Sequence, residues 1–595
     1  MKIYKAHWQE ISKGILASVL FLVPLFFWPG FTQNFELPKA LLFRSLILIA
    51  LSFNTIKLLK TKHPLIKIIL ALTALLTIAT IISPARIQSF FGTQERTQGL
   101  IQWFYYLGFF FLLLANLNKK HLQELISVFL ISSGIVAGYA IFQNYGYDPF
   151  FKHYDTAFLL GRAFSTLGNP DFLGQFISLA IPLSISRIRK NKLLYPLLTI
   201  ILFLALFYSQ SRAPIAGLLV AGSIYLLHLI IKKKAFKLVA TTIAATTVIL
   251  LTLFFTTNLL ERFTPNSTNF NSISSRITIA KASTKIISQN PLFGIGPENF
   301  GSQSKEYLSP QFHVDELSMN TTTDRAHNDL LEIGIATGIP GIITWIILIF
   351  YLIKGFFRST EKTHQALYLA SLTYIFQNFF SFSLTSHFVI FFFLLSAIVK
   401  TESTEKNTEK FNPLTLLIIP IVFYFSIFKV AQAENTFSYA LHVQTYDYDK
   451  SIELIEDTIE SNPYYAYYRY KLLIRDESII PEQSTEIRKI EGETMDNLGW
   501  EAVSISKSDL SKSITLFEKI IEKNPEYPAG NRIFGDAYYR NGKYAEAIPH
   551  YEKFLDLAPQ FWRWCPEINE KTEWERWQYR IFHKNTFDFT TQQDI

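Results

Sequence analysis

The chain has 595 residues, of which 49% are hydrophobic and 15% aromatic, and its mean hydropathy is positive. Soluble globular proteins seldom have this composition, so we expect a polytopic membrane protein. The single cysteine, Cys565, excludes an intrachain disulfide and argues against a thiolate metal cluster.

The net charge of +8 is divided unevenly along the chain. Residues 1–429 contain 37 Lys and Arg against 19 Asp and Glu, whereas residues 430–595 contain 19 against 29. This asymmetry indicates two regions in different surroundings, and we place a domain boundary between residues 429 and 430. Because the basic excess lies in short loops, it indicates membrane topology, and no nucleic-acid partner is expected.

Apolar runs near the length of a membrane span recur through residues 1–429 and predict an all-α protein with about 12 to 13 transmembrane helices. The first run follows Lys2, Lys5 and Lys13 as in a signal peptide, but it lacks a small-residue cleavage site, so we expect it to be retained. The predicted spans are residues 14–28, 37–58, 65–82, 99–115, 122–143, 172–185, 193–208, 214–231, 236–256, 330–353, 366–382, 387–399 and 413–428.

Lysine and arginine cluster in the N-terminal tail and in every second loop, which should therefore be cytoplasmic. The intervening segments are then extracytoplasmic, and the largest of them spans residues 257–328. With thirteen spans, the chain after residue 428 is also outside. We therefore predict a multi-pass protein of the cytoplasmic membrane, surrounded by its lipids, with an extracytoplasmic C-terminal domain.

The extracytoplasmic segments contain isolated arginines beside helix ends, namely Arg96, Arg162, Arg212 and Arg276. Outside arginines oppose the positive-inside tendency, so each requires a reason. One alternative is that each extends to lipid headgroups or pairs with a local acid. Four arginines on one predicted face favour an anionic ligand.

The C-terminal region has the pattern of an α-helical tetratricopeptide repeat. Gly535, Tyr538, Ala547 and Tyr551 follow that repeat's spacing, and Pro559 lies one 34-residue period after Pro525. Such units stack into concave binding surfaces, so a protein partner is expected there. The alternative is that the repeats only stabilise or space the membrane domain.

Four motifs lie in order along the predicted outer face. They are RAFSTLGNPDFL at residues 162–173, SQSRA at 209–213, NPLFGIGPENF at 290–300 after Arg276, and AHND at 326–329 followed by Glu332, Gly338 and Gly341. Together they resemble the O-antigen ligase and O-antigen polymerase family, which includes bacterial protein O-oligosaccharyltransferases. The resemblance covers about residues 14–400. Asp171 replaces the family's usual Asn and Ala213 its usual Gly, and neither change removes a charge that the chemistry needs.

The resemblance implies that a glycan is transferred from an undecaprenyl-diphosphate carrier to a lipid, glycan or protein acceptor outside the membrane. The activated donor would supply the energy, so no cofactor is expected. No convincing acidic cluster occurs in the outer loops, and we expect no metal. Asp447 and Asp449 form a DxD pattern, but they lie in the helical tail, where this short pattern is common by chance.

The residue types suit this chemistry. Arg212 and Arg276 are expected to hold the diphosphate, because the guanidinium forks match phosphate oxygens. His327 is expected to act as the base, kept neutral by Arg325 and the following helix start, although it could instead make a structural hydrogen bond. The residues expected to assist substrate binding are Arg96, Arg162, Asn169 and Arg325.

A second class of function stays open at this level. The protein could be a non-catalytic membrane scaffold or transporter that recruits partners through its helical repeats. Transport would favour polar residues midway along the spans, whereas most charges here lie at the ends of the predicted helices.

Overall fold

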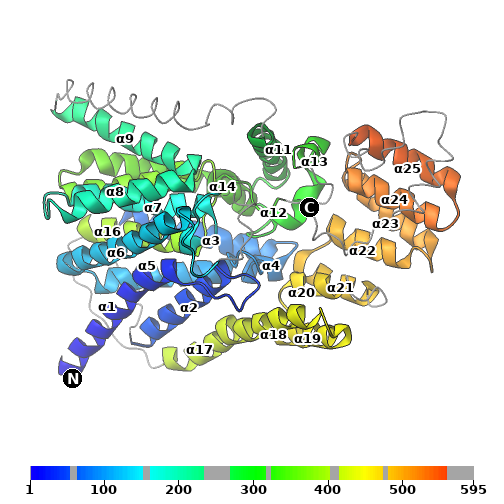
Figure 1. Ribbon diagram of the computed structural model, residues 1–595, viewed down its shortest axis with the longest axis horizontal. Helices are drawn as coiled ribbons and strands as arrows, with labels where there is room; N and C mark the ends of the chain where they lie inside the picture. Colours follow the sequence, from blue (N-terminus) through cyan, green and yellow to red (C-terminus); the bar gives the residue numbers. More distant parts are fainter. Residues whose placement is uncertain are drawn as a thin grey trace.

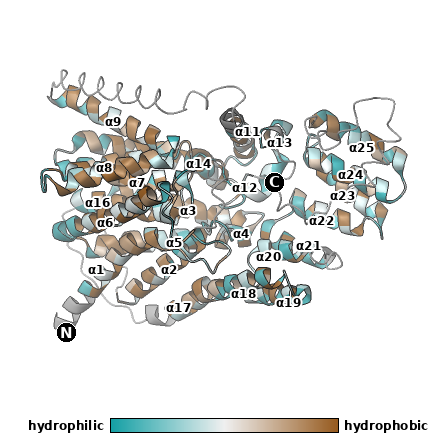
Figure 2. Cartoon of the chain, in the orientation of Figure 1, coloured by the Kyte–Doolittle hydropathy of each residue, from teal (hydrophilic) through white to brown (hydrophobic). Residues whose placement is uncertain are grey.

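A computed structural model of the chain describes residues 2–53, 63–151, 161–233, 268–316, 323–402, 414–473 and 480–558. Every secondary-structure element in these ranges is a helix, and the helices form an apolar bundle and a more polar tail (Figures 1 and 2). The predicted all-α class, with a helical C-terminal region, is confirmed.

The bundle contains most of the apolar helices. They are α1 (Lys2–Leu25), α2 (Glu36–Phe53), α3 (Pro64–Ile82), α5 (Leu100–Asn116), α6 (Lys119–Asn144), α7 (Pro170–Ser186), α8 (Leu194–Ser209), α9 (Arg212–Lys233), α14 (Asp329–Arg358), α15 (Lys362–Gln377), α16 (Thr385–Glu402) and α17 (Leu414–Phe423). In the described ranges, α3, α6, α9, α14 and α16 are long and apolar enough to cross a membrane, and α5 and α8 are shorter apolar helices. The predicted span at 236–256 lies outside the described residues, and each of the other predicted spans overlaps a helix.

Helix α14 is broken at Gly338, whose φ is +72°. Pro340 has no N–H to donate to Ala336, so the break leaves backbone groups without helical partners. The segment 291–296 supplies partners. Ile295 N donates to Ile335 O (2.8 Å), Gly296 N donates to Ala336 O (3.1 Å), and Ile339 N donates to Pro291 O (2.8 Å). The loop therefore completes the hydrogen bonding of the helix, as buried irregular backbone requires.

This close approach explains the glycines of the NPLFGIGPENF motif. Gly294 has a φ of +65°, and a Cβ at this position would lie 2.2 Å from the carbonyl oxygen of Ile335. Gly296 has a φ of +89°, and its Cβ would lie 2.5 Å from Ser89 Oγ. Neither position accommodates a side chain in this arrangement.

Part of the predicted loop 257–328 is helical. It contains α11 (Thr268–Gln289), α12 (Phe300–Gln303) and α13 (Pro310–Asp315), which lie between the bundle and the tail (Figure 1). Ile286, Phe300 and Phe312 share a small core with Ile335 of α14. This core fixes the segment that leads into α14.

The tail begins without a break in the helix. Helix α17 continues through a five-residue π-helix at Tyr424–Phe428 into α18 (Lys429–Val443), so the predicted boundary after residue 429 falls within continuous helix. Phe437 of α18 belongs to the main core of the bundle. The following helices are α19 (Tyr448–Ser461), α20 (Ala466–Leu473), α21 (Ile480–Glu491), α22 (Met495–Ile505), α23 (Leu510–Lys523), α24 (Pro528–Arg540) and α25 (Tyr544–Leu557).

The tail helices pack as successive pairs, with α22 on α23 and α24 on α25. Gly535 and Tyr551, two of the predicted repeat residues, meet where α24 crosses α25. Asp447 of the DxD pattern caps α19, because its Oδ1 accepts a hydrogen bond from Lys450 N (3.0 Å). That aspartate therefore has a structural task at a helix start.

Candidate active site

The turn at residues 323–328 presents His327 at the entrance of α14. Asn328 caps this helix, since its Oδ1 accepts from Leu330 N (2.9 Å) and Leu331 N (3.1 Å). His327 has a φ of +51°, and its half-buried ring lies 5.2 Å from the ring of Phe382. A left-handed non-glycine residue is costly, so the surrounding contacts must hold this turn.

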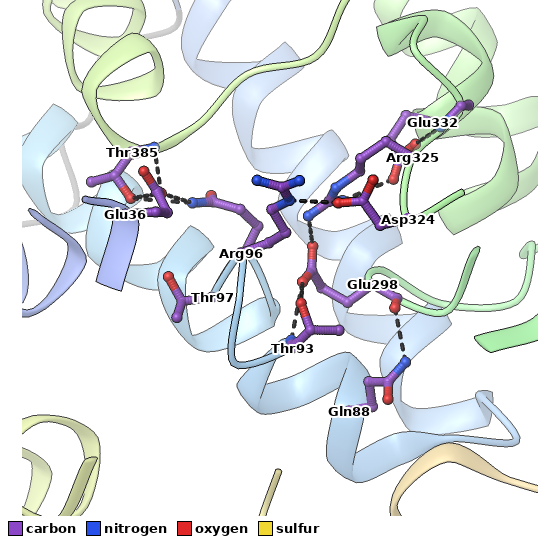
Figure 3. A network of polar contacts seen from close by, with 12 residues as sticks. Glu36, Gln88, Thr93, Arg96, Thr97, Glu298, Asp324, Arg325, Glu332 and Thr385 are labelled. Carbon is purple, nitrogen blue, oxygen red and sulfur yellow. Dashed lines mark hydrogen bonds and ion pairs between the residues drawn. The ribbon is translucent and has the colours of Figure 1, made fainter. Parts of the chain in front are cut away.

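Arg325 supplies much of that restraint. It is buried and forms ion pairs with Glu298 and, through Nη1, with Glu332 Oε1 (2.9 Å) (Figure 3). Glu332 also accepts from Ala326 N (2.9 Å). The guanidinium is therefore paired with carboxylates inside the protein, and these ion pairs restrain the turn that carries His327.

Arg96 lies in a loop that follows α4 (Arg86–Phe91). Its Nε is 2.5 Å from Asp324 Oδ2 (Figure 3). Its guanidinium lies 5.2 Å from the centroid of the Phe382 ring. Asp324 lies in the same turn as His327, three residues before it, and the Phe382 ring also contacts His327. The Arg96 loop and the His327 turn are thus joined directly.

Arg162 and Asn169 act on the start of α7. Arg162 Nη2 lies 2.6 Å from Asp171 Oδ1, and Arg162 Nε donates to Ser209 O (2.9 Å). Asn169 caps α7, because its Oδ1 accepts from Asp171 N (2.8 Å). Asp171, which departs from the family pattern, therefore adds a charge partner for Arg162 and ties α7 to the end of α8.

Arg276 and Arg212, the two residues expected to hold the diphosphate, are both exposed. Arg276 projects from α11, and none of the residues in the described ranges forms a hydrogen bond or ion pair with it. Its charge nevertheless acts on both His327 and Asp171, which places it near these two residues. Arg212 is the first residue of α9 and is also exposed.

The electrostatic setting keeps His327 neutral. Burial, Arg276 and Arg96 lower the pKa of His327 to about 4, against the opposing effect of Asp324 and Asp171. Burial raises the pKa of Asp324, but Arg96 and Arg325 outweigh it, so this pKa lies below its ordinary value. The cause of His327 neutrality therefore differs from the expected one, because Arg325 is paired with carboxylates.

Contacts join Arg96 and Arg325 to the turn that carries His327. The charge of Arg276 acts on His327 and on Asp171, which is the ion-pair partner of Arg162. The partners that sequence reasoning did not single out are the carboxylates Asp324 and Glu298 and the ring of Phe382. Two outer arginines do pair with local acids, as one of the sequence alternatives proposed. Within the described ranges, no group of three or more His, Cys, Asp or Glu side chains is arranged to hold a metal ion.

Comparison with protein-family models gave two matches. Residues 197–346 match the model described as O-antigen ligase. The predicted resemblance is confirmed. The O-antigen ligase match runs from α8 into α14 and includes Arg212, Arg276 and His327, whereas Arg96 and Arg162 lie outside it. Residues 533–561 match a tetratricopeptide repeat, which confirms the repeat predicted in the tail. A comparison with curated proteins gave no match.

The O-antigen ligase match supports a membrane protein that transfers glycans. It also supports lipid-linked glycans as the class of substrate, and the repeat match supports a protein interaction in the tail. The chemical roles of individual side chains depend on the geometry described above.

Proposed function

We propose that the protein moves a glycan from an undecaprenyl-diphosphate carrier to a lipid, glycan or protein acceptor at the outer face of the cytoplasmic membrane. The observation that carries this proposal is an exposed Arg276, without an ion-pair partner among the described residues, beside a His327 that is kept neutral. Both lie in the segment that matches O-antigen ligases.

Arg276 and Arg212 hold the diphosphate in this proposal. A guanidinium stays charged at all relevant pH values and offers its donors in a planar fork that fits phosphate oxygens. Arg212 also stands at the N-terminus of the 22-residue helix α9, where backbone N–H groups favour an anion. Charge builds up on the diphosphate as it leaves, so both cations act most strongly in the transition state.

His327 accepts the proton of the acceptor in the transfer step. The acceptor hydroxyl oxygen attacks the anomeric carbon of the glycan, and the bond from that carbon to the diphosphate oxygen breaks. The hydroxyl proton passes to the neutral imidazole, and undecaprenyl diphosphate leaves with the bonding electron pair. The arginines supply the positive charge at the leaving group, so the proposed reaction is metal-independent and uses no cofactor.

Arg96 and Arg162 assist from the edge of the site. Arg96 is bonded to Asp324 through Nε, and its two terminal nitrogens make no hydrogen bond with a described residue (Figure 3). Arg162 contributes charge beside Asp171. In this proposal Asn169 and Arg325, which were expected to bind substrate, instead hold α7 and the His327 turn in place.

The proposal is tested with purified protein in lipid vesicles, a polyprenyl-diphosphate oligosaccharide and a panel of acceptors. Acceptor-dependent release of polyprenyl diphosphate is expected, and Arg276→Ala and His327→Ala should reduce it. Lys281→Ala removes a positive charge from the exposed face of the same helix and serves as the matched control. No release with any acceptor would favour the non-catalytic scaffold or transporter.

A further inference from the structure

The helical tail makes a buried polar contact with the bundle through Glu434 of α18. This side chain is fully buried, and no lysine or arginine in the described part of the chain forms an ion pair with it. Its carboxylate instead accepts hydrogen bonds from both units. The donors are Thr32 N (2.9 Å), the Thr32 hydroxyl, Gln33 N (3.4 Å), Gln94 Nε2 (3.0 and 3.1 Å) and the Tyr468 hydroxyl (2.8 Å).

Gln94 belongs to the Arg96 loop, which we define as residues 93–98. Four carboxylates hold this loop, and Glu434 is the one among them that comes from the tail. The contacts are Thr93 N to Glu298 (3.0 Å), Gln94 Nε2 to Glu434 (3.0 Å), Arg96 Nε to Asp324 (2.5 Å) and Gln98 Nε2 to Glu36 (3.0 Å). The loop conformation is therefore set by several distant segments at once.

A displacement of Gln94 should also displace Arg96, two residues further along the same loop. The loop is closed by Thr97 N donating to Thr93 O (2.8 Å), with Thr97 at a φ of +55°, so its residues move together. Arg96 in turn pairs with Asp324 and lies on Phe382, the ring that His327 contacts. A continuous path of contacts leads from α18 to the candidate base.

We infer that Glu434 is a positioning residue, through which the tail holds the Arg96 loop in register with the His327 turn. This inference rests on the proposed function. It means that α18, the first helix of the tail, helps to position the residues of the active site. The repeat helices α22 and α23 contact a different segment, through ion pairs of Asp496 with Lys305 and of Lys523 with Glu306.

Other contacts also attach the tail, and they do not involve the Arg96 loop. Phe91 stacks on Tyr464 at 3.9 Å between ring centroids, and Lys523 Nζ lies 2.8 Å from Glu306 Oε1. If attachment alone matters, breaking the Lys523 pair should resemble breaking the Glu434 contact. If the Glu434 contact instead positions the Arg96 loop, only the loss of that contact should alter labelling and transfer.

The test uses a reporter on the loop itself. Thr97 of this loop is buried, and its hydroxyl makes no hydrogen bond with a described residue, so maleimide labelling of Thr97→Cys in a Cys565→Ser background reports opening of the loop. Glu434→Gln replaces an acceptor oxygen by an NH₂ group that faces the donors of Thr32 and Gln94. We expect labelling to accelerate at least about tenfold and the transfer kcat/KM to fall about 10-fold to 100-fold, while Lys523→Met changes neither.

The reciprocal variant Gln94→Glu with Glu434→Gln should bring both readouts back toward the unmutated values, because donor and acceptor are exchanged. Gln94→Met probes the same contact from the bundle side if Glu434→Gln does not fold. Unchanged labelling in these single variants, or faster labelling with unchanged kcat/KM, would overturn the inference. Labelling needs no substrate, so a failure of the unmutated protein to transfer glycan would contradict the proposed function separately.

Discussion

Replacing Arg276 with alanine should shift the acid limb of the pH–rate profile. Burial, Arg276 and Arg96 lower the pKa of His327 from its ordinary value of 6.5 to about 4. This change corresponds to about 3 kcal/mol against the imidazolium. Burial remains when Arg276 is removed, so the pKa should rise above 4 and stay below 6.5.

The direction in which the acid limb moves follows from the role of His327 as the base. Only the neutral imidazole accepts a proton, so activity is full above the pKa of His327 and falls as the pH drops through it. The acid limb of kcat/KM, which reports the free enzyme, should therefore move to higher pH in Arg276→Ala. At pH 7 His327 is neutral in both proteins. A rate loss there, expected at about 10²–10³, reports lost charge stabilisation of the leaving diphosphate.

Release of polyprenyl diphosphate from vesicles would be followed between about pH 3.5 and 8, at low and saturating donor. The bound diphosphate opposes the arginines, so the limb of kcat should lie at higher pH than that of kcat/KM. Lys281→Ala controls for loss of one charge from α11. An unshifted limb in Arg276→Ala, or an equal shift in Lys281→Ala, would refute the reasoning.

Three further predictions concern the base, the loop and the topology. His327→Ala should reduce turnover by about 10²–10⁴ with donor affinity retained in equilibrium binding, and full turnover would exclude it as the base. Gly294→Ala should destabilise the protein by at least about 1–3 kcal/mol from backbone strain, because its φ is +65° and its Cβ would meet an α14 carbonyl oxygen. Thermal unfolding in detergent measures this, with Gly222→Ala as the control, since nothing lies within 4 Å of a Cβ there. Compartment reporters fused at Asn435 and Lys406 should give opposite signals, and the same signal from both would place the tail in the cytoplasm.

Local patterns predicted the helices and the repeat, because hydropathy and spacing act over neighbouring residues. Arg96 and Arg276 were singled out because arginine is uncommon on the predicted outer face. The carboxylates that pair with Arg96 and Arg325 could not be predicted from local sequence patterns. Asp324 pairs with Arg96, and Glu298 with Arg325, only after segments distant in sequence fold together.

Two further features, helix α11 and the continuous helix at residue 430, also depended on tertiary structure. The segment 268–289 is polar overall, so its helix α11 has little signal apart from a few isoleucines that pack in its small core. The charge balance changes near residue 430, but helical periodicity continues through it, and Phe437 packs in the bundle core. The change in charge balance near residue 430 therefore does not coincide with a break in the helix.

The break in α14 has a consequence for how the protein is made. Ile335 O and Ala336 O take their hydrogen bonds from residues 295 and 296, which are synthesised before α14. A carbonyl left without a partner in lipid costs several kcal/mol. Stable insertion of α14 therefore requires that the preceding segment packs against the break and supplies these two donors. Membrane integration of this helix and closure of the site should occur as one coupled event during biogenesis.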